Sequence, residues 1–151
     1  MFRSWINLEF IDISSLDTSN VDNMRYMFKG CNSLKSLNLS NFNPRNVKKM
    51  DNMLNGCNSL EILDISNFNT SFVNETNNMF LDCYSLKVLD LSHFDTSNVN
   101  NISGIFLNCY SLTSLELGNF NTSLVTDMSN MFNNCTSLIS LNLKVLIQKK
   151  L

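Results

Sequence analysis

Five cysteines recur at one repeated position, and cysteine is the residue type in this chain best suited to bind a metal or form disulfides. They are Cys31, Cys57, Cys83, Cys109 and Cys135. Zinc sites use ligands about two to four residues apart with further ligands nearby, whereas each cysteine here stands alone at an apolar position. An odd number of side chains that point the same way also argues against disulfides. We therefore predict a row of buried free thiols, with no metal and no cofactor.

His93 is the single histidine of the sequence. It occupies the repeat position that asparagine fills at Asn41, Asn67 and Asn119. A catalytic triad needs a nucleophile, a base and an orienting group together, and nothing distinguishes one serine from the many in turn positions. The sequence also lacks a Gly-rich phosphate loop, a His-Glu-x-x-His motif and an EF-hand motif. We expect His93 to be an ordinary surface or turn residue and the protein not to be an enzyme.

A row of acidic residues is the strongest candidate for binding. One residue per repeat lies between two apolar positions, and these residues are Asp12, Asn38, Asp64, Asp90, Glu116 and Asn142. If they lie on stacked strands, the consecutive carboxylates of Asp64, Asp90 and Glu116 are about 5 Å apart and attract a cation or a basic partner. Neighbouring apolar residues are expected to face outward as well: Phe10, Ile62 and Val88. Such a mixed strip suits a protein or peptide partner, and the alternative is a merely solvated face.

Two tyrosines form a second binding candidate. Tyr84 and Tyr110 occupy equivalent positions in neighbouring repeats, so we predict that their rings form an exposed pair. Tyrosine is enriched at interface hot spots, although partly buried loop tyrosines are the commoner case.

All these candidates depend on a 26-residue repeat that runs through the chain. A Met-Phe pair or a close variant opens each unit, as at Met27-Phe28 and Met79-Phe80. The predicted units are 1–26, 27–52, 53–78, 79–104 and 105–130, with a partial unit at 131–143. Residues 144–151 diverge and are expected to form a C-terminal tail or cap. A fixed period of this length predicts one domain, a solenoid whose units bury their apolar sides against one another.

Each unit combines two periodicities. Leu86, Leu89 and Leu91 give a Leu-x-x-Leu-x-Leu pattern, which predicts a short strand with Leu89 and Leu91 inward. Apolar residues over 99–109 then recur three or four positions apart, which favours helical or 3-10 turns. The predicted fold is an α/β leucine-rich-repeat-like right-handed coil with a short parallel sheet on one side and these turns on the other. Six strands are expected, near Ile11, Leu37, Leu63, Leu89, Leu115 and Leu141.

With this pattern the chain resembles the bacterial surface-protein 26-residue repeat family, a BspA-like branch of the leucine-rich repeats. Residues 91–99 and 131–138 match the family pattern closely, and the likeness covers residues 1 to about 143. Asn43-Pro44-Arg45 departs from the usual Thr-Ser run, so that loop is expected to differ from its neighbours. The resemblance implies cell-surface or extracellular proteins of bacteria and some protists, with adhesion or partner binding as their role and no catalytic residues.

Charge and composition exclude several other classes. The formal net charge of −2 gives no general attraction to nucleic acid or to an anionic membrane. No apolar run approaches the roughly 20 residues needed to cross a bilayer, and no signal peptide or anchor is visible. We expect no nucleic-acid partner and no membrane insertion by this segment.

The sequence thus favours a non-enzymatic repeat module that binds protein or mediates adhesion at a cell surface through its outward strand face. One alternative is a spacer or stalk segment of a larger surface protein. Glycan binding is a minor alternative, because Thr-Ser pairs recur along the chain. Since the end coils of a solenoid expose apolar surface, end-to-end self-association is expected if the ends are uncapped.

Overall fold

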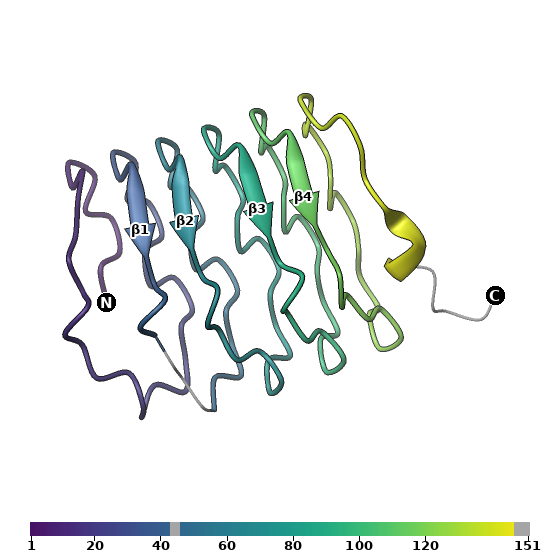
Figure 1. The fold of residues 1–151 in the computed structure, drawn as a ribbon, viewed down its shortest axis with the longest axis horizontal. Coiled ribbons are helices and arrows are strands. Elements are labelled where there is room, and N and C mark those ends of the chain that lie inside the picture. Colours follow the sequence, from purple (N-terminus) through teal and green to yellow (C-terminus); the bar gives the residue numbers. More distant parts are fainter. Residues whose placement is uncertain (43–45, 147–151) are drawn as a thin grey trace.

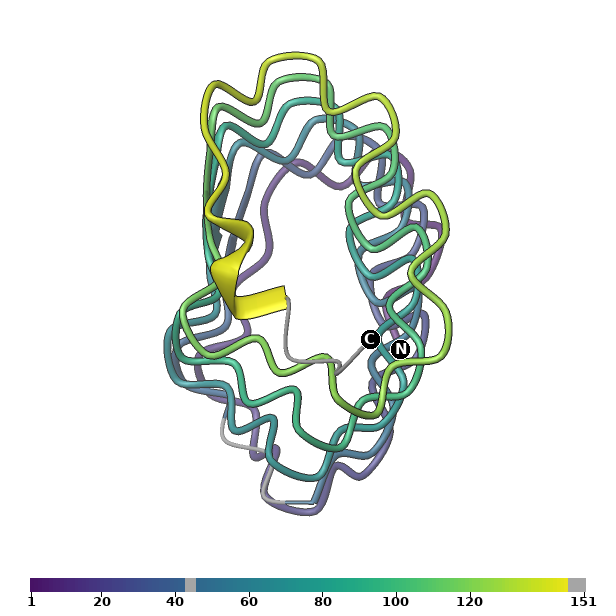
Figure 2. The same ribbon diagram turned by 90° about the vertical axis from the view of Figure 1, so that its right-hand side faces the viewer.

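The computed structural model describes residues 1–42 and 46–146. Within them the chain winds in successive coils that lie side by side, with the N-terminus at one end and residues 143–146 at the other (Figure 1). Seen along the stack, the coils superpose as similar rings (Figure 2). The distinct loop expected at 43–45 and the last residues of the tail, 147–151, lie outside the described residues.

Four three-residue strands line one side of the coils, which we call the strand wall. They are β1 (Ser36–Asn38), β2 (Ile62–Asp64), β3 (Val88–Asp90) and β4 (Ser114–Glu116). Leu37 pairs with Leu63 and Leu89 with Leu115, both in parallel, which confirms the predicted short parallel strands and their register. The described residues show no strand near Ile11 or in the last unit. The prediction of six strands was therefore wrong at these two positions.

The strands do not form one continuous sheet. β1 pairs with β2 and β3 with β4, and within the described chain these two sheets are separate. Each paired junction carries a side-chain bridge, since Asn67 Nδ2 donates to the Ser40 carbonyl and Asn119 Nδ2 to the Ser92 carbonyl. At the β2–β3 junction the equivalent residue is His93, and its Nε2 lies 2.9 Å from the Ile65 carbonyl oxygen instead.

The opposite side of the coils, the return wall, comprises residues 23–31, 49–57, 75–83, 101–109 and 127–135. Here parallel bridges join every neighbouring pair of units, from Asn23–Lys49 to Asn101–Asp127. Backbone N–H groups also donate to the next unit, as Phe28 does to Met53 at 2.9 Å. The return wall is therefore hydrogen-bonded without interruption, unlike the strand wall.

The expected helical or 3-10 form of the return segments is not what the structure describes there. They consist of consecutive turns closed by i→i+3 bonds, such as Met27 N–H to the Met24 carbonyl and Cys31 N–H to the Phe28 carbonyl. Within the described residues, the one 3-10 helix is η1 (Leu143–Leu146), and there is no α-helix.

Left-handed residues explain why these segments turn rather than coil into a helix. Two positions per unit have a positive φ, which breaks a right-handed helix and is tolerated best by glycine and asparagine. The first row is Tyr26, Asn52, Asn78, Gly104 and Asn130, and the second is Ser4, Gly30, Gly56, Asp82, Asn108 and Asn134. A positive φ at the third residue of an i→i+3 turn is the feature of type II turns. Stacked turns place apolar residues three or four apart just as a helix does.

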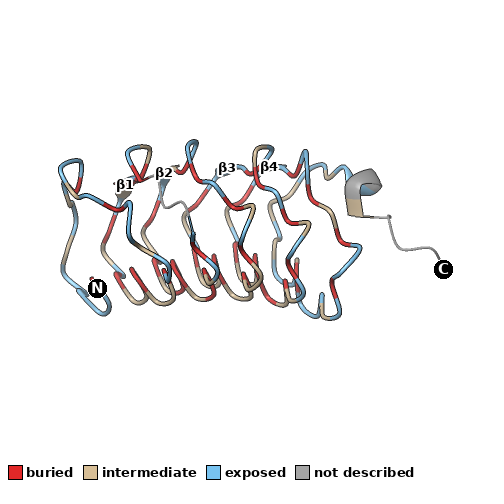
Figure 3. Cartoon of the chain, turned by 90° about the horizontal axis from the view of Figure 1, so that it is seen from below, coloured by how far each residue is buried: buried red, intermediate tan, exposed pale blue. Residues whose placement is uncertain are grey.

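Buried residues recur in successive coils along the stack (Figure 3), and together they form the hydrophobic core. It consists of rows of like residues, because equivalent side chains of successive units stack on one another. Phe80 and Phe106 are examples, with parallel rings whose centroids are 5.8 Å apart. The strand leucines Leu37, Leu89 and Leu115 are buried as predicted, while Leu63 is partly exposed beside the open β2–β3 junction.

The two ends of the stack are covered to different degrees. At the C-terminal end η1 lies at one side of the last coil and reaches part of the way into its opening (Figure 2). Thr122 Oγ1 donates to the Leu146 carbonyl, and Leu146 packs against the core. At the N-terminal end the Trp5 ring meets Phe2 edge-on, yet Trp5 stays about half exposed.

Candidate functional site

The predicted acidic row lies on the outer surface of the strand wall. Asp12, Asp90 and Glu116 are exposed, and Asp64 is half-buried beside the open β2–β3 junction. Strand pairing puts Asp90 directly opposite Glu116, and Asp64 opposite Asn38. The structure therefore places these side chains on one face, with the three consecutive carboxylates spread over two sheets.

Most of these carboxylates also accept hydrogen bonds from the residue two positions on, which we did not predict. Asp64 Oδ1 accepts hydrogen bonds from the Ser66 hydroxyl at 2.7 Å and from the Ser66 N–H at 3.0 Å. Asp90 and Asp12 accept the N–H two residues on in the same way, as Asn38 does at 2.8 Å. These are Asx-turns at the ends of β1, β2 and β3 and at the equivalent position of the first unit, and Asn serves them as well as Asp. The signal was in the sequence as Asp/Asn-x-Ser.

Hydrogen bonding of the ionised form lowers the pKa of these carboxyl groups. For Asp64 and Asp90 the chief cause is the hydroxyl of the following serine, Ser66 or Ser92, and for Asp12 it is the Ser14 N–H. The three groups are therefore anionic at neutral pH. An electronegative strand wall follows from the same contacts that shape its turns.

A groove lies on the strand wall at the junction of the first and second units. Its volume is about 540 Å³, and it extends from Phe10 and Asp12 across Leu37 to Ile62 and Asp64. Phe10 is 69% exposed and Ile62 is 68% exposed, so two large apolar side chains flank it in water. The groove thus combines apolar walls with two carboxylates.

Smaller hollows, about 150 Å³ each, lie at two further places on the strand wall. One is lined by Asp64, Asp90 and His93 at the β2–β3 junction. The other lies where β4 meets the last unit and is lined by residues that include Glu116 and Asn142. Each of the three hollows includes a junction at which the strands are not paired, and the larger groove also extends over the paired β1–β2 junction. Val88, the third predicted apolar residue, is 62% exposed at the edge of β3.

The two tyrosines lie side by side as predicted. The ring centroids of Tyr84 and Tyr110 are 5.3 Å apart with planes tilted by 46°, and both side chains are partly exposed. Burial, and then the nearby Asp82 carboxylate, raise the pKa of Tyr84. The pair borders the return wall, so it is not part of the strand-wall groove.

The cysteine row is used for packing. All five thiols are free, and four are buried. Each Sγ donates to a backbone carbonyl of the preceding unit, as Cys57 does to Phe28 at 3.2 Å and Cys83 to Leu54 at 3.4 Å. Burial raises the pKa of all five thiols, so they stay protonated and unreactive. Among residues 1–42 and 46–146, no group of His, Cys, Asp and Glu is placed to hold a metal ion.

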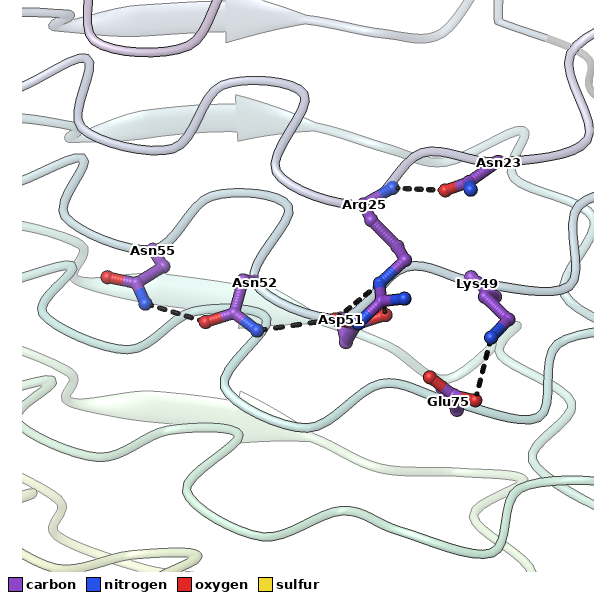
Figure 4. A network of polar contacts seen from close by, with 7 residues as sticks. All are labelled: Asn23, Arg25, Lys49, Asp51, Asn52, Asn55 and Glu75. Carbon is purple, nitrogen blue, oxygen red and sulfur yellow. Dashed lines mark hydrogen bonds and ion pairs between the residues drawn. The ribbon is translucent and has the colours of Figure 1, made fainter.

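Sequence reasoning missed a polar network on the return wall (Figure 4). The Asp51 side chain is only 2% exposed, and the Arg25 Nε lies 2.8 Å from its Oδ1 and 2.9 Å from its Oδ2. Asn52 donates to Asp51, and Asn55 donates to Asn52. The signal was an acidic residue at a repeat position that carries Asn or Ser in the next units. Nearby, Lys49 and Glu75 form a separate ion pair at 3.1 Å.

In comparison with solved structures, the fold is similar to that of leucine-rich-repeat proteins. A leucine-rich cell surface protein from Faecalibacterium prausnitzii A2-165 matches 78% of this chain at 21% identity with a TM-score of 0.50. This chain spans 35% of that protein. A T. pallidum leucine-rich repeat protein matches 80% of the chain at 20% identity, with a TM-score of 0.46 and 62% of its own length covered. A leucine-rich repeat protein from Bacteroides ovatus matches 80% at 24% identity, with a TM-score of 0.32 and 40% of its length covered.

A comparison of the sequence with protein-family models shows the family of this chain. Residues 1–89 and 49–144 match the family described as Mycoplasma protein of unknown function, DUF285. The chain belongs to this family. Among curated proteins, none matches significantly. Within the described residues, no helix has the length and apolar character needed to cross a membrane.

Proposed function

We propose that this protein is a non-enzymatic binding module that recognises a protein segment through its strand wall at a cell surface. The observation that carries the proposal is the groove at the first junction, with exposed Phe10 and Ile62 beside the carboxylates of Asp12 and Asp64. Exposed apolar side chains of this size cost solvation free energy unless a partner covers them. The leucine-rich-repeat fold supports a binding role, and the description of the F. prausnitzii protein supports a surface location. We also propose that the chain is one domain of 26-residue units related to the BspA-like repeats.

The chemistry of the groove defines the partner. An apolar side chain of the partner fits between Phe10 and Ile62, and a Lys or Arg beside it pairs with Asp12 or Asp64. Burying the apolar anchor supplies most of the binding free energy, while the charge pairs at the rim mainly set orientation and association rate. The expected ligand is therefore an extended segment with an apolar residue flanked by basic residues.

A peptide selection tests this proposal. We expect a random peptide library selected on the protein to yield sequences with an apolar residue next to Lys or Arg. The variant Phe10→Ser/Ile62→Ser should lose their binding by about tenfold or more. Phe72→Ser/Leu124→Ser is the matched control, because both residues are 56% exposed and lie in another row of the repeat.

Two results would contradict the proposal. If selected peptides bound both double variants equally, the groove would not be the site. If selection enriched no peptide at all, the spacer or stalk role would gain support, because a spacer needs no tuned surface. Glycan binding would gain support only from retention on immobilised glycans that the groove variant leaves unchanged.

A further inference from the structure

We propose that Arg3, Arg25 and Lys29, gathered around Tyr26 on the return wall, bind the sulfate groups of an acidic polysaccharide. This site lies on the opposite wall from the strand-wall groove and is independent of the function proposed above.

Three cations converge on one aromatic ring. The guanidinium carbons of Arg3 and Arg25 and the Nζ of Lys29 each lie 5.4 Å from the centroid of the Tyr26 ring. Each contact is within the range of a cation–π interaction, and one such contact occurs about once per 70–80 residues in proteins. The attraction to the ring offsets part of the repulsion among the three charges. The ring thus holds together positive charges that would otherwise move apart.

Tyr26 occupies a backbone position that does not suit it. Its φ is 59°, and the equivalent residues Asn52, Asn78, Gly104 and Asn130 are of the types that tolerate left-handed φ. A bulky aromatic residue in that conformation costs about 1 kcal/mol or more, and such strain gathers at functional positions. The turn itself would be better served by Asn or Gly, so the needs of the turn do not account for the tyrosine.

Arg25 is held in place by the polar network of Figure 4. Its Nε contacts the buried Asp51 carboxylate, which is fixed in turn by Asn52. The Arg25 N–H also donates to Asn23 Oδ1 at 2.9 Å, so its backbone is fixed too. A guanidinium held in this way loses little freedom on binding an oxyanion.

The cluster has a surplus of positive charge. Arg3 and Lys29 occupy the same repeat position in neighbouring units, and like charges at such positions repel. Among the described residues, the salt bridges are Arg25–Asp51, Lys35–Glu9 and Lys49–Glu75, so Arg3 and Lys29 take part in none. Of the three cations, Arg25 alone is paired with a carboxylate among the described residues, and that carboxylate, Asp51, is buried. An anion from outside would neutralise the remainder.

The form of the cluster favours a polymer over a free ion. Arg3 is exposed and Lys29 is half-exposed, so the charges lie along the surface rather than in an enclosed pocket. A single small ion would be held weakly there because water and salt screen it. A chain that carries several sulfates can contact Arg3 and Lys29 on successive units at once, and such multivalent contact raises the affinity. Sulfate oxygens also suit the donor geometry of arginine.

Binding of a labelled heparin-type oligosaccharide at low salt, followed by fluorescence anisotropy, tests the site. The double variant Arg3→Gln/Lys29→Gln should bind about tenfold or more weakly, because it removes the two cations that have no carboxylate partner. It leaves the Arg25–Asp51 pair intact, and a melting curve checks its fold. Lys48→Gln/Lys87→Gln is the matched control, with the same change in net charge at two exposed lysines outside the cluster. The control should bind within about twofold of the wild type.

Further binding measurements use the wild-type protein. The desulfated oligosaccharide should not bind, affinity should fall as salt rises, and free inorganic sulfate should compete only at far higher concentration. If Arg3→Gln/Lys29→Gln and Lys48→Gln/Lys87→Gln lost affinity equally, the binding would depend on net charge alone, and the proposed site would be wrong. Equal binding of the desulfated sugar, or competition by free sulfate at matched sulfate concentration, would also show it to be wrong. Phe10→Ser/Ile62→Ser should leave this binding unchanged, so failure here is separate from failure of the strand-wall proposal.

Discussion

The strand wall and the return wall are made from the same repeat, yet they are hydrogen-bonded differently. Parallel bridges connect all the units on the return wall, whereas the strand wall is paired only within β1–β2 and β3–β4. Three hollows with exposed apolar or acidic linings lie on the strand wall, and each includes a junction at which the strands are not paired. The difference shows that one wall can hold the stack together while the other is free to vary its surface.

Substitutions in the core should have the largest effect on stability, and the effect should be similar on the two walls. Phe80 on the return wall and Leu89 on the strand wall are both almost wholly buried. We expect Phe80→Ala to cost about 3–5 kcal/mol and Leu89→Ala about 2–5 kcal/mol, because each leaves a cavity between stacked units. Urea unfolding measures both, with the exposed Ser92→Ala as a control that costs less than about 1 kcal/mol. A cost for Leu89→Ala as small as the control's would show that the strand wall is not packed as described.

A polar substitution on the return wall should come next. Arg25→Gln removes the cation beside the buried Asp51 carboxylate, and we expect a clear fall in the urea-unfolding midpoint. The fall stays below that of a fully buried pair because Arg25 is about a third exposed. The matched change Lys35→Gln, in the exposed Lys35–Glu9 pair, should lower the midpoint much less. Equal falls would mean that burial of Asp51 contributes nothing.

Restoring asparagine at the open β2–β3 junction sharpens the comparison. His93→Asn should allow the same bridge that Asn67 and Asn119 make, from the side-chain amide to a carbonyl of the preceding unit. We expect slower amide hydrogen exchange in β3 and a gain of up to about 1 kcal/mol. Return-wall amides should be protected to the same degree before and after. Unchanged exchange in β3 would show that another cause keeps the two sheets apart.

Acid should weaken the strand wall by a small amount. Asp12, Asp64 and Asp90 have lowered pKa values in the folded protein. Their ionised forms therefore stabilise the fold above the unfolded-state pKa of about 4, and this contribution disappears as the pH falls through the lower folded-state values. We expect the melting temperature to decline below about pH 4. Replacing all three by Asn should flatten that decline, since Asn keeps the Asx-turn without titrating. If the triple Asn variant had the same pH profile of melting temperature as the wild type, these carboxylates would not be the cause of the decline in acid.

Much of this architecture was predictable from the sequence because stacking imposes like residues on like positions. The register of Leu37 with Leu63 and of Leu89 with Leu115 follows directly from the repeat. The return wall was harder, because a spacing of three or four fits both a helix and consecutive turns. Asparagine or glycine at Asn52, Asn78 and Gly104 was the available clue to left-handed turns.

The candidate sites were predictable only in part. The sequence indicated which residues face outward, including Phe10 and Ile62, because side chains alternate along a strand. It did not indicate which junctions stay open, since that depends on small differences in the spacing of adjacent units. The gathering of Arg3, Arg25 and Lys29 on Tyr26 was also beyond it, because a charged residue in a turn has many available rotamers.

The uninterrupted return wall has a consequence for how such a chain can change over generations. The parallel bridges along it join equivalent positions of neighbouring units, and the hydrogen bonds repeat from one unit to the next, so adding or deleting one whole unit would recreate the same contacts. Adding one residue within a unit would break the correspondence on both walls at once. Duplication or loss of a 78-nucleotide stretch of the gene, which is about 26 codons, is therefore a tolerated event, whereas small insertions in the return segments are not. The molecule can lengthen or shorten in whole steps without redesigning its core.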